Sequence, residues 1–99
     1  MTEKKLIAVS TLCTHYEIEI TFVDELYKMG LIQVEVVEQD RFIHQEQISD
    51  LEKMIRLHHE LNVNLEGIDV VFNLLEKERL LRSELEALKN KLRLYENDF

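Results

Sequence analysis

The sequence contains no proline and only two glycines, Gly30 and Gly67, in 99 residues. Tight turns between short strands depend heavily on these two residue types, so their scarcity argues against a β-sandwich or a barrel with many hairpins. The one cysteine, Cys13, cannot form a disulfide within the chain. The composition therefore favours a mainly helical domain in a reducing compartment.

Long apolar runs are also missing. No stretch approaches the ~20 apolar residues that a membrane-spanning helix needs, and no basic segment followed by an apolar one opens the sequence. We therefore expect a cytoplasmic protein that does not enter the membrane. At 45% apolar and 32% charged residues, the chain is long enough for one small domain with a modest core.

Positive charge is scarce as well. The chain has 12 Lys and Arg against 20 Asp and Glu, which gives a net charge of −8. Residues 1–50 hold most of the imbalance, with ten acids and four bases. Proteins that bind the phosphate backbone of nucleic acids are usually basic, so this balance favours a basic protein surface as the partner. The alternative, an acidic face that is merely solvated, stays open.

Two short helices are predicted in the first third of the chain. The first runs from about residue 11 to 17, with Ser10 or Thr11 as its N-cap. The second begins after a cap at Thr21 and ends at Gly30, which supplies the positive φ of a helix terminus. Two short helices so close in sequence predict a helix-turn-helix.

Three other segments predict β structure. The apolar run at 6–9 is typical of a strand or an extended lead-in. Residues 33–38 are rich in valine and partly alternating, as in a half-buried strand, and residues 41–43 predict the returning strand after a turn at Gln39 and Asp40. These strands form a small hairpin, the wing of a winged helix-turn-helix.

A longer helix is predicted from about Gln45, followed by a short joint. Asn62 suits a left-handed C-cap, and Asn64 suits the N-cap of a last helix that begins near Leu65. The apolar face of the helix before the joint comprises Ile48, Leu51, Met54, Ile55, Leu57 and Leu61.

The last helix carries a heptad seam, with apolar residues at alternating spacings of three and four and one polar position, Glu78. The headpiece, residues 1–63, cannot cover the full length of the helical arm, residues 64–99. We therefore predict a homodimer in which a second chain covers the seam. The flanking charges do not decide between parallel and antiparallel pairing. The seam comprises Val71, Leu74, Glu78, Leu81, Leu85, Leu88, Leu92, Tyr95 and Phe99.

Candidate catalytic or metal-binding groups are few. His58 and His59 are adjacent, so on a helix their side chains diverge by about 100° and cannot easily bind one ion. We expect a core histidine and a boundary histidine. His15 and His44 are isolated in sequence, and Cys13 is expected to be a small buried thiol. The sequence therefore predicts no catalytic residue, no metal site and no cofactor.

Acidic residues in the first half are the candidates for partner binding: Asp24, Glu25, Glu17, Glu35 and Glu38. Asp24 and Glu25 lie in the helix that enters the major groove in a DNA-binding helix-turn-helix. Between residues 10 and 30 the sequence has one base, Lys28, and four acids. Such a surface repels phosphates, which argues against DNA contact.

The order of elements resembles the MerR family of winged-helix regulators. The matching motifs are YKMGLI at 27–32, RFIHQEQISDLEKMIRLHHELNVNLEGI at 41–68, and the terminal heptads. The resemblance covers almost the whole chain. MerR regulators usually carry arginine and tyrosine in the first helices and an arginine-containing wing, whereas this sequence has TLCTHYEIE and VEVVEQDRF. We also expect no effector domain after the arm.

The motif RLHHEL at 56–61, the pair Gly67-Ile68 and the leucine-rich arm are similar to the chaperone-modulator (CbpM) branch of that family. The resemblance implies a non-enzyme that binds the J-domain of a DnaJ-like co-chaperone (CbpA). By covering the basic second helix of the J-domain, such a protein inhibits cooperation with DnaK.

Two alternatives remain. One is a MerR-type transcription factor that contacts DNA through Lys28, Arg41, Lys4 and Lys5. The other is a coiled-coil adaptor, which would keep its partner without the headpiece.

Overall fold

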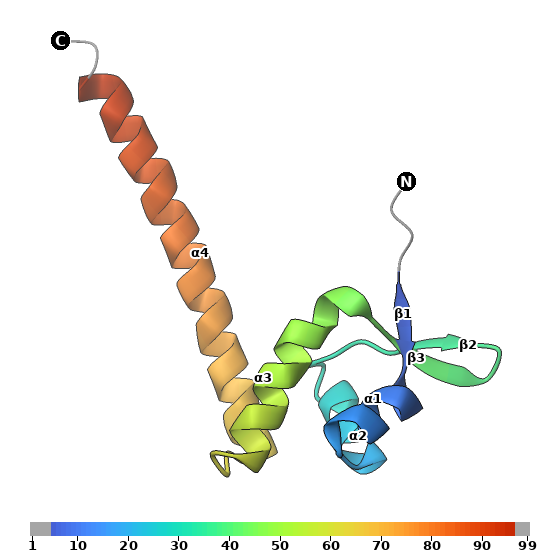
Figure 1. Ribbon diagram of the computed structural model, residues 1–99. Helices are drawn as coiled ribbons and strands as arrows, with labels where there is room; N and C mark the ends of the chain where they lie inside the picture. The colour runs from blue at the N-terminus through green and yellow to red at the C-terminus, as the bar shows by residue number, and fades with distance from the viewer. Residues whose placement is uncertain (1–4, 97–99) are drawn as a thin grey trace. The chain divides into compact units, whose positions relative to one another are not determined.

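The computed structural model describes residues 5–96 (Figure 1). By internal contacts the chain divides into two compact units, the first ending at Asp69 and the second beginning at Val70. A three-stranded antiparallel sheet and short helices form the first unit, and a long helix begins in it and makes up the second. This confirms a mainly α winged helix-turn-helix with a small β wing and a long C-terminal helix. The elements are β1 (Leu6–Ala8), α1 (Val9–Tyr16), α2 (Ile20–Lys28), β2 (Glu35–Val37), β3 (Asp40–His44), the 3₁₀ turn η1 (Gln45–Gln47), α3 (Ile48–His59) and α4 (Leu65–Glu96).

The first helix starts earlier than its side chains predict. Ala8 is the N-cap of α1, and no side chain caps it, so the prediction of Ser10 or Thr11 as the cap is wrong. Strand β1 leads directly into the helix, and the hydroxyl of Thr14 donates to the carbonyl of Ser10 at 3.0 Å inside it. The strand's pairing with β3, rather than a capping hydroxyl, determines where α1 begins.

The second helix also begins two residues early, but its end matches the prediction. Glu19, not Thr21, occupies the N-cap position of α2. Gly30 has φ +77°. Its amide donates to the carbonyl of Tyr27, and the next amide, of Leu31, donates to Leu26, both at 3.0 Å. These two bonds form a Schellman motif, in which glycine ends the helix without steric cost.

The wing is a two-residue hairpin between β2 and β3, with sheet order β1-β3-β2. Val37 pairs with Asp40, so the turn residues are Glu38 and Gln39, with φ of +50° and +72°. The predicted turn at Gln39 and Asp40 is therefore one residue too late. Positive φ at both central positions matches the right-handed twist of the flanking strands. Every residue of β2 is exposed, which corrects the expectation of a half-buried strand.

The core lies between the helices of the first unit and β3. Val23 and Leu26 of α2, Ile43 of β3, Leu51 of α3 and Ile68 of α4 are fully buried. Leu51 confirms the predicted buried face of α3. Leu61, assigned to the same face, is 63% exposed because α3 ends at His59, before that residue.

The joint between α3 and α4 has the predicted chemistry. Asn62 has φ +56°, which places it in the left-handed region as expected. The side-chain oxygen of Asn64 accepts a hydrogen bond from the amide of Gly67 at 2.8 Å, and its carbonyl accepts one from Ile68 at 2.9 Å. Asn64 is therefore the N-cap of α4, as predicted.

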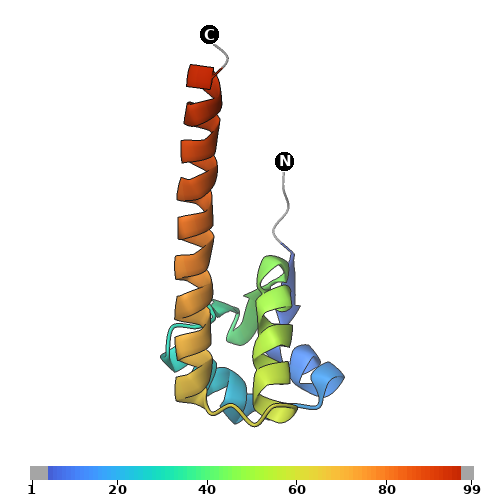
Figure 2. The same ribbon diagram turned by 90° about the vertical axis from the view of Figure 1, so that its left-hand side faces the viewer.

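Helix α4 is continuous from Leu65 to Glu96 (Figure 2). Two ion pairs span single turns of its surface: Arg79 lies 2.6 Å from Glu76, and Arg82 pairs with Glu78. Both pairs are exposed to solvent, so they contribute little to the stability of the helix.

Candidate partner-binding surface

Asp24, the first acid predicted to bind a partner, already forms an ion pair within the chain. Its carboxylate forms an ion pair with the guanidinium of Arg41, which joins α2 to strand β3. Both side chains are little more than one-third exposed. The pair neutralises Arg41, the one arginine of the hairpin, through a carboxylate of α2.

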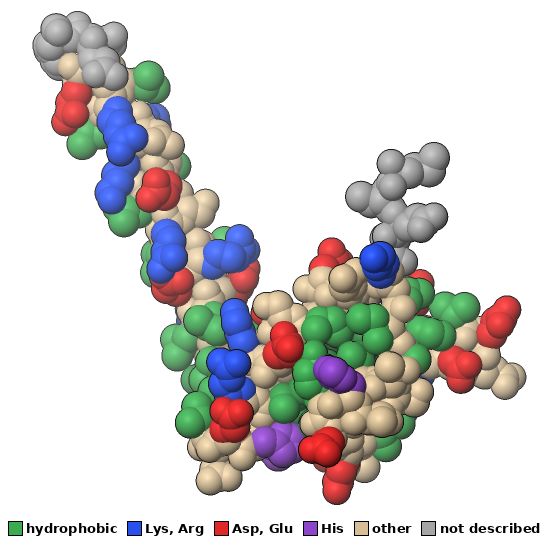
Figure 3. All heavy atoms as spheres, viewed as in Figure 1, with side chains coloured by type: hydrophobic (Ala, Val, Ile, Leu, Met, Phe, Trp, Pro, Cys, Tyr) green, Lys and Arg blue, Asp and Glu red, His purple; other side chains and the backbone are tan. Residues whose placement is uncertain are grey.

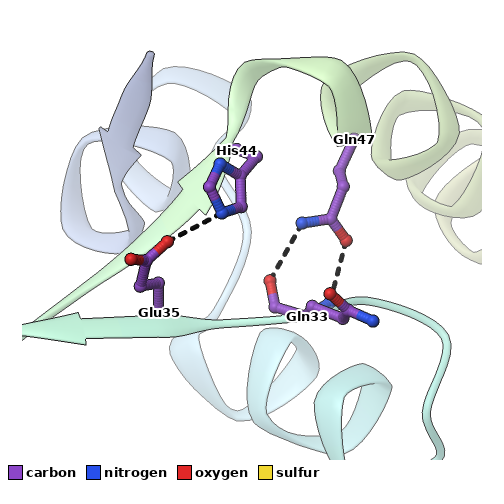
Figure 4. Close-up of polar contacts among 4 residues, drawn as sticks. All are labelled: Gln33, Glu35, His44 and Gln47. Atoms are coloured by element: carbon purple, nitrogen blue, oxygen red, sulfur yellow. Dashed lines mark hydrogen bonds and ion pairs between the residues drawn. The ribbon is translucent and has the colours of Figure 1, made fainter. Parts of the chain in front are cut away.

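Glu35 is also engaged, at the base of the hairpin (Figure 4). Its carboxylate lies 2.7 Å from Nε2 of His44. Beside it, the side-chain amide of Gln47 accepts a hydrogen bond from the Gln33 amide at 2.8 Å and donates one to the Gln33 carbonyl at 3.1 Å. These contacts tie the segment before β2 to η1, so Glu35 has a structural partner.

The other three predicted acids have free carboxylates among residues 5–96. Glu17, Glu25 and Glu38 are exposed, and none forms an ion pair with another described residue. Glu17 ends α1 and Glu38 opens the hairpin turn, both in left-handed conformations. The structure thus separates five acids of similar appearance into two that are paired and three that are available.

A hollow of about 280 Å³, hereafter the Ile20 hollow, lies where the hairpin meets the starts of α1 and α2. Ile20 is 46% exposed there, although it is apolar. Asp40 contributes an exposed carboxylate that pairs with no other described residue. The hollow is lined by Ala8, Val9, Ser10, Ile20, Gln39, Asp40, Arg41 and Phe42.

Sequence reasoning missed Ile20 and Asp40 as surface candidates. With the helix start placed at Thr21, Ile20 fell outside the helix, and Asp40 was assigned to the turn. Ile20 and Asp24 are four residues apart, so they lie on the same side of α2. That spacing would have placed Ile20 on the side of α2 that faces Arg41 of the hairpin, had the helix been started two residues earlier.

The exposed side of α2 differs from that of a DNA-reading helix. Ile20 and Tyr27 expose apolar surface on it, and Lys28 is its one base. Arg41, a candidate DNA contact, is already paired with Asp24. Lys5 is exposed, and Lys4 lies outside the described residues.

The vicinal histidines pack against an aromatic ring. The His58 and Phe22 ring centroids are 4.7 Å apart, and the His58 and His59 centroids are 5.1 Å apart. Nδ1 of His58 is buried without a hydrogen bond, while His59 is exposed. His58 is half-buried against Phe22 and not the fully buried core histidine that was expected. No group of three or more potential metal ligands occurs within residues 5–96.

Two titratable groups have pKa values that the packing raises. Burial raises the pKa of the Cys13 thiol; the charge of Arg41 opposes this effect and that of Asp24 reinforces it. Burial, together with a 3.0 Å hydrogen bond from its hydroxyl to Glu52, raises the pKa of Tyr16. Both groups are therefore neutral near pH 7.

The heptad seam of α4 is exposed over the second unit. From Leu74 onward, each described leucine of the seam and Tyr95 expose about half or more of their surface. Phe99 lies outside the described residues. A row of large apolar side chains in water marks an interaction surface. No helix within residues 5–96 combines the length and apolar character that crossing a bilayer requires.

Comparison with known proteins gives two matches. The profile of the MerR HTH family of regulatory proteins matches residues 7–90. A relative from Pseudomonas entomophila (strain L48), the chaperone modulatory protein CbpM, is 28% identical over 83 residues, which cover 83% of this chain and 82% of the relative. No solved structure gives a significant match.

Proposed function

Because the chain belongs to the MerR HTH family of regulatory proteins, we propose that it is a non-enzymatic chaperone modulator of the cytoplasm. It binds the J-domain of a DnaJ-like co-chaperone of the CbpA type and thereby inhibits the cooperation of that co-chaperone with DnaK. Similarity to a CbpM protein over 83% of the chain supports this function.

The observation that carries the proposal is the charge on α2, the helix that reads DNA in a DNA-binding helix-turn-helix. Asp24 on α2 neutralises Arg41, and Glu25 is exposed on the same helix. A helix-turn-helix with these side chains repels the phosphate backbone and attracts basic polypeptides. The fold family is that of DNA readers, whereas the electrostatics of this helix favour a cationic protein.

The mechanism is electrostatic attraction followed by steric cover. Exposed carboxylates increase the rate of encounter with a basic surface, and apolar neighbours then exclude water from the contact. Glu17, Glu25 and Glu38 have free carboxylates for this role. Asp24 and Glu35 add to the negative field but remain bound to Arg41 and His44.

The working form is proposed to be a homodimer joined through α4. Leu81, Leu85, Leu88 and Leu92 provide an exposed apolar row with heptad spacing. A second copy that covers this row removes its apolar surface from water, at about 25 cal/mol per Å². The dimer then presents two headpieces.

The proposal is tested by titrating the full-length protein with the purified J-domain of the DnaJ-like protein from the same organism, using calorimetry. In parallel, the ATPase activity of DnaK stimulated by the full co-chaperone is measured with and without the modulator. We expect a complex and a loss of stimulation. A wild-type protein that neither binds nor inhibits contradicts the proposal.

Salt dependence distinguishes charge from shape. Raising NaCl from about 50 mM to about 300 mM shortens the screening length roughly twofold, so affinity is expected to fall several-fold. An affinity that stays constant over this range would rule out the acidic surface as the main determinant of binding.

A DNA-binding regulator is the second candidate, because the family match spans the helix-turn-helix and the wing. Fluorescence anisotropy with a labelled random duplex at low salt separates the two functions. The chaperone-modulator proposal expects no binding of the duplex at concentrations that saturate the J-domain. Binding at those concentrations would favour the regulator.

A further inference from the structure

We propose that the Ile20 hollow receives a lysine or arginine side chain from a basic helix of the partner, and that it forms the centre of the docking surface. This inference rests on the proposed function, since it locates the contact that the function requires. It names an apolar centre, which the acidic residues predicted from the sequence do not supply.

The lining of the hollow suits a side chain with an apolar stem and a cationic end. Ile20, Ala8 and Phe42 provide apolar atoms, and Asp40 provides a carboxylate. Long basic side chains pack their methylene groups on apolar surface while the charge reaches a polar partner. A volume of about 280 Å³ is sufficient for one such side chain.

The lining carries one acid and one base, but the base is paired with a carboxylate outside the lining. Arg41 lines the hollow, but its guanidinium binds Asp24 of α2. Asp40 has no such partner among the described residues. A cation that enters the hollow therefore meets one uncompensated carboxylate.

Exposed apolar residues also occur on β2 and α2, the hairpin strand and the helix near the hollow. Val36 on β2 is 65% exposed, and Tyr27 on α2 is 52% exposed. Figure 3 shows apolar and acidic side chains next to one another on the hairpin. Large apolar groups exposed beside acids are typical of a docking surface with an apolar centre and a charged rim.

Charge selects the occupant among the possible partners. Nucleic acid is repelled by Asp40 and by the exposed Glu38 beside it. A second copy of this chain carries the same net charge of −8 and is therefore repelled overall. A basic amphipathic helix supplies both the cation and the apolar contacts.

Two full-length variants test the location. Ile20→Ser removes the apolar contact, and we expect the affinity for the purified J-domain to fall about tenfold or more, as for a central interface residue. Asp40→Asn removes the charge without changing the shape, and we expect a decrease of about two- to fivefold at low salt. That decrease should vanish at about 0.5 M NaCl, where exposed charges are screened.

Matched controls lie at the joint between α3 and α4, outside the lining of the hollow. Leu61→Ser removes an exposed leucine, and Glu60→Gln removes an exposed carboxylate. Both are expected to bind the J-domain as the wild type does. Circular dichroism verifies the fold of each variant, and Asp40→Asn, at an exposed position, provides the test if Ile20→Ser does not fold.

The outcomes separate the two proposals. Loss of affinity in the hollow variants with unchanged controls supports the docking site. Wild-type binding that neither hollow variant weakens overturns the site and leaves the proposed function intact. Failure of the wild type itself to bind the J-domain overturns the function and the site together.

Discussion

At the residue scale, Gly30 and Gln39 occupy the same left-handed backbone region, but only Gln39 has a Cβ. A Cβ added at Gly30 would meet nothing within 4 Å, so only the backbone opposes it. We expect Gly30→Ala to lower the free energy of unfolding by about 1 kcal/mol, and Gln39→Gly to raise it by about 0.5 kcal/mol.

Urea denaturation of both variants measures these changes. They share one cause, the cost of positive φ for a residue with a Cβ, and so should have opposite signs. If Gly30→Ala were neutral, the helix terminus would not depend on glycine, and the Schellman motif would need another explanation.

Cys13 should react slowly for a free thiol. Burial raises its pKa, so less thiolate is present at pH 8 than in an unstructured peptide. We expect iodoacetamide to alkylate Cys13 of the folded protein more slowly than it alkylates the thiol of glutathione. Both rates should rise with pH. Because the Arg41 charge lowers this pKa, Arg41→Met should slow the reaction further.

The same shift has a consequence for stability. The folded thiol keeps its proton at pH values where the unfolded thiol has begun to lose it. The folded state therefore binds more protons there, and the free energy of unfolding falls as the pH rises through the ordinary thiol range. Alkylation of the native protein as fast as that of the urea-unfolded protein would contradict the raised pKa.

At the scale of elements, the Asp24–Arg41 pair connects α2 to the wing. Asp24→Asn breaks the ion pair, and because both groups are partly exposed the expected loss of stability is at most about 1 kcal/mol. Glu25→Gln makes the same change of net charge on the same helix without breaking an ion pair, and should cost less. Equal stabilities in urea would show that the pair does not hold the wing.

Helix ends were predictable where one residue controls them. Gly30 and Asn64 act through their own backbone or side-chain chemistry, and each has its predicted role. Asn62 adopts the predicted left-handed conformation, but the C-cap of α3 is Glu60.

The predicted caps, Ser10 or Thr11 for α1 and Thr21 for α2, were wrong, and no side chain caps either helix. For α1, the pairing of β1 with β3, which is not local in sequence, precedes the helix directly.

The fate of the predicted acids could not be read from their positions. Asp24 and Arg41 are 17 residues apart, and the hairpin brings them together. Glu35 meets His44 only because β2 folds back on β3 in this register. Composition gives the sign of the surface, whereas the register decides which carboxylates remain available.

At the scale of the whole molecule, the seam of α4 offers a matched pair for testing the dimer. Leu85 lies in the seam and Leu80 lies outside it, and each is 50% exposed. We expect Leu85→Lys to yield a monomer, because it would place a charge in the buried seam, and Leu80→Lys to remain a dimer. Sedimentation equilibrium gives both masses.

A wild-type protein that sediments as a monomer would contradict the dimer, as would equal effects of the two lysines.

The family and the mainly helical fold were accessible from the sequence, because motifs along almost the whole chain carry them. The Ile20 hollow was not, since three separate segments of the chain form it.

The position of strand β2 at the edge of the sheet bears on aggregation of the protein at high concentration. It is an edge strand with two exposed valines, Val36 and Val37, a combination that invites β-strand aggregation. Glu35 and Glu38 flank those valines, and identical strands approaching edge to edge would bring like charges together. We therefore expect these carboxylates to oppose edge-to-edge pairing of β2 between molecules, although the strand itself stays exposed to water.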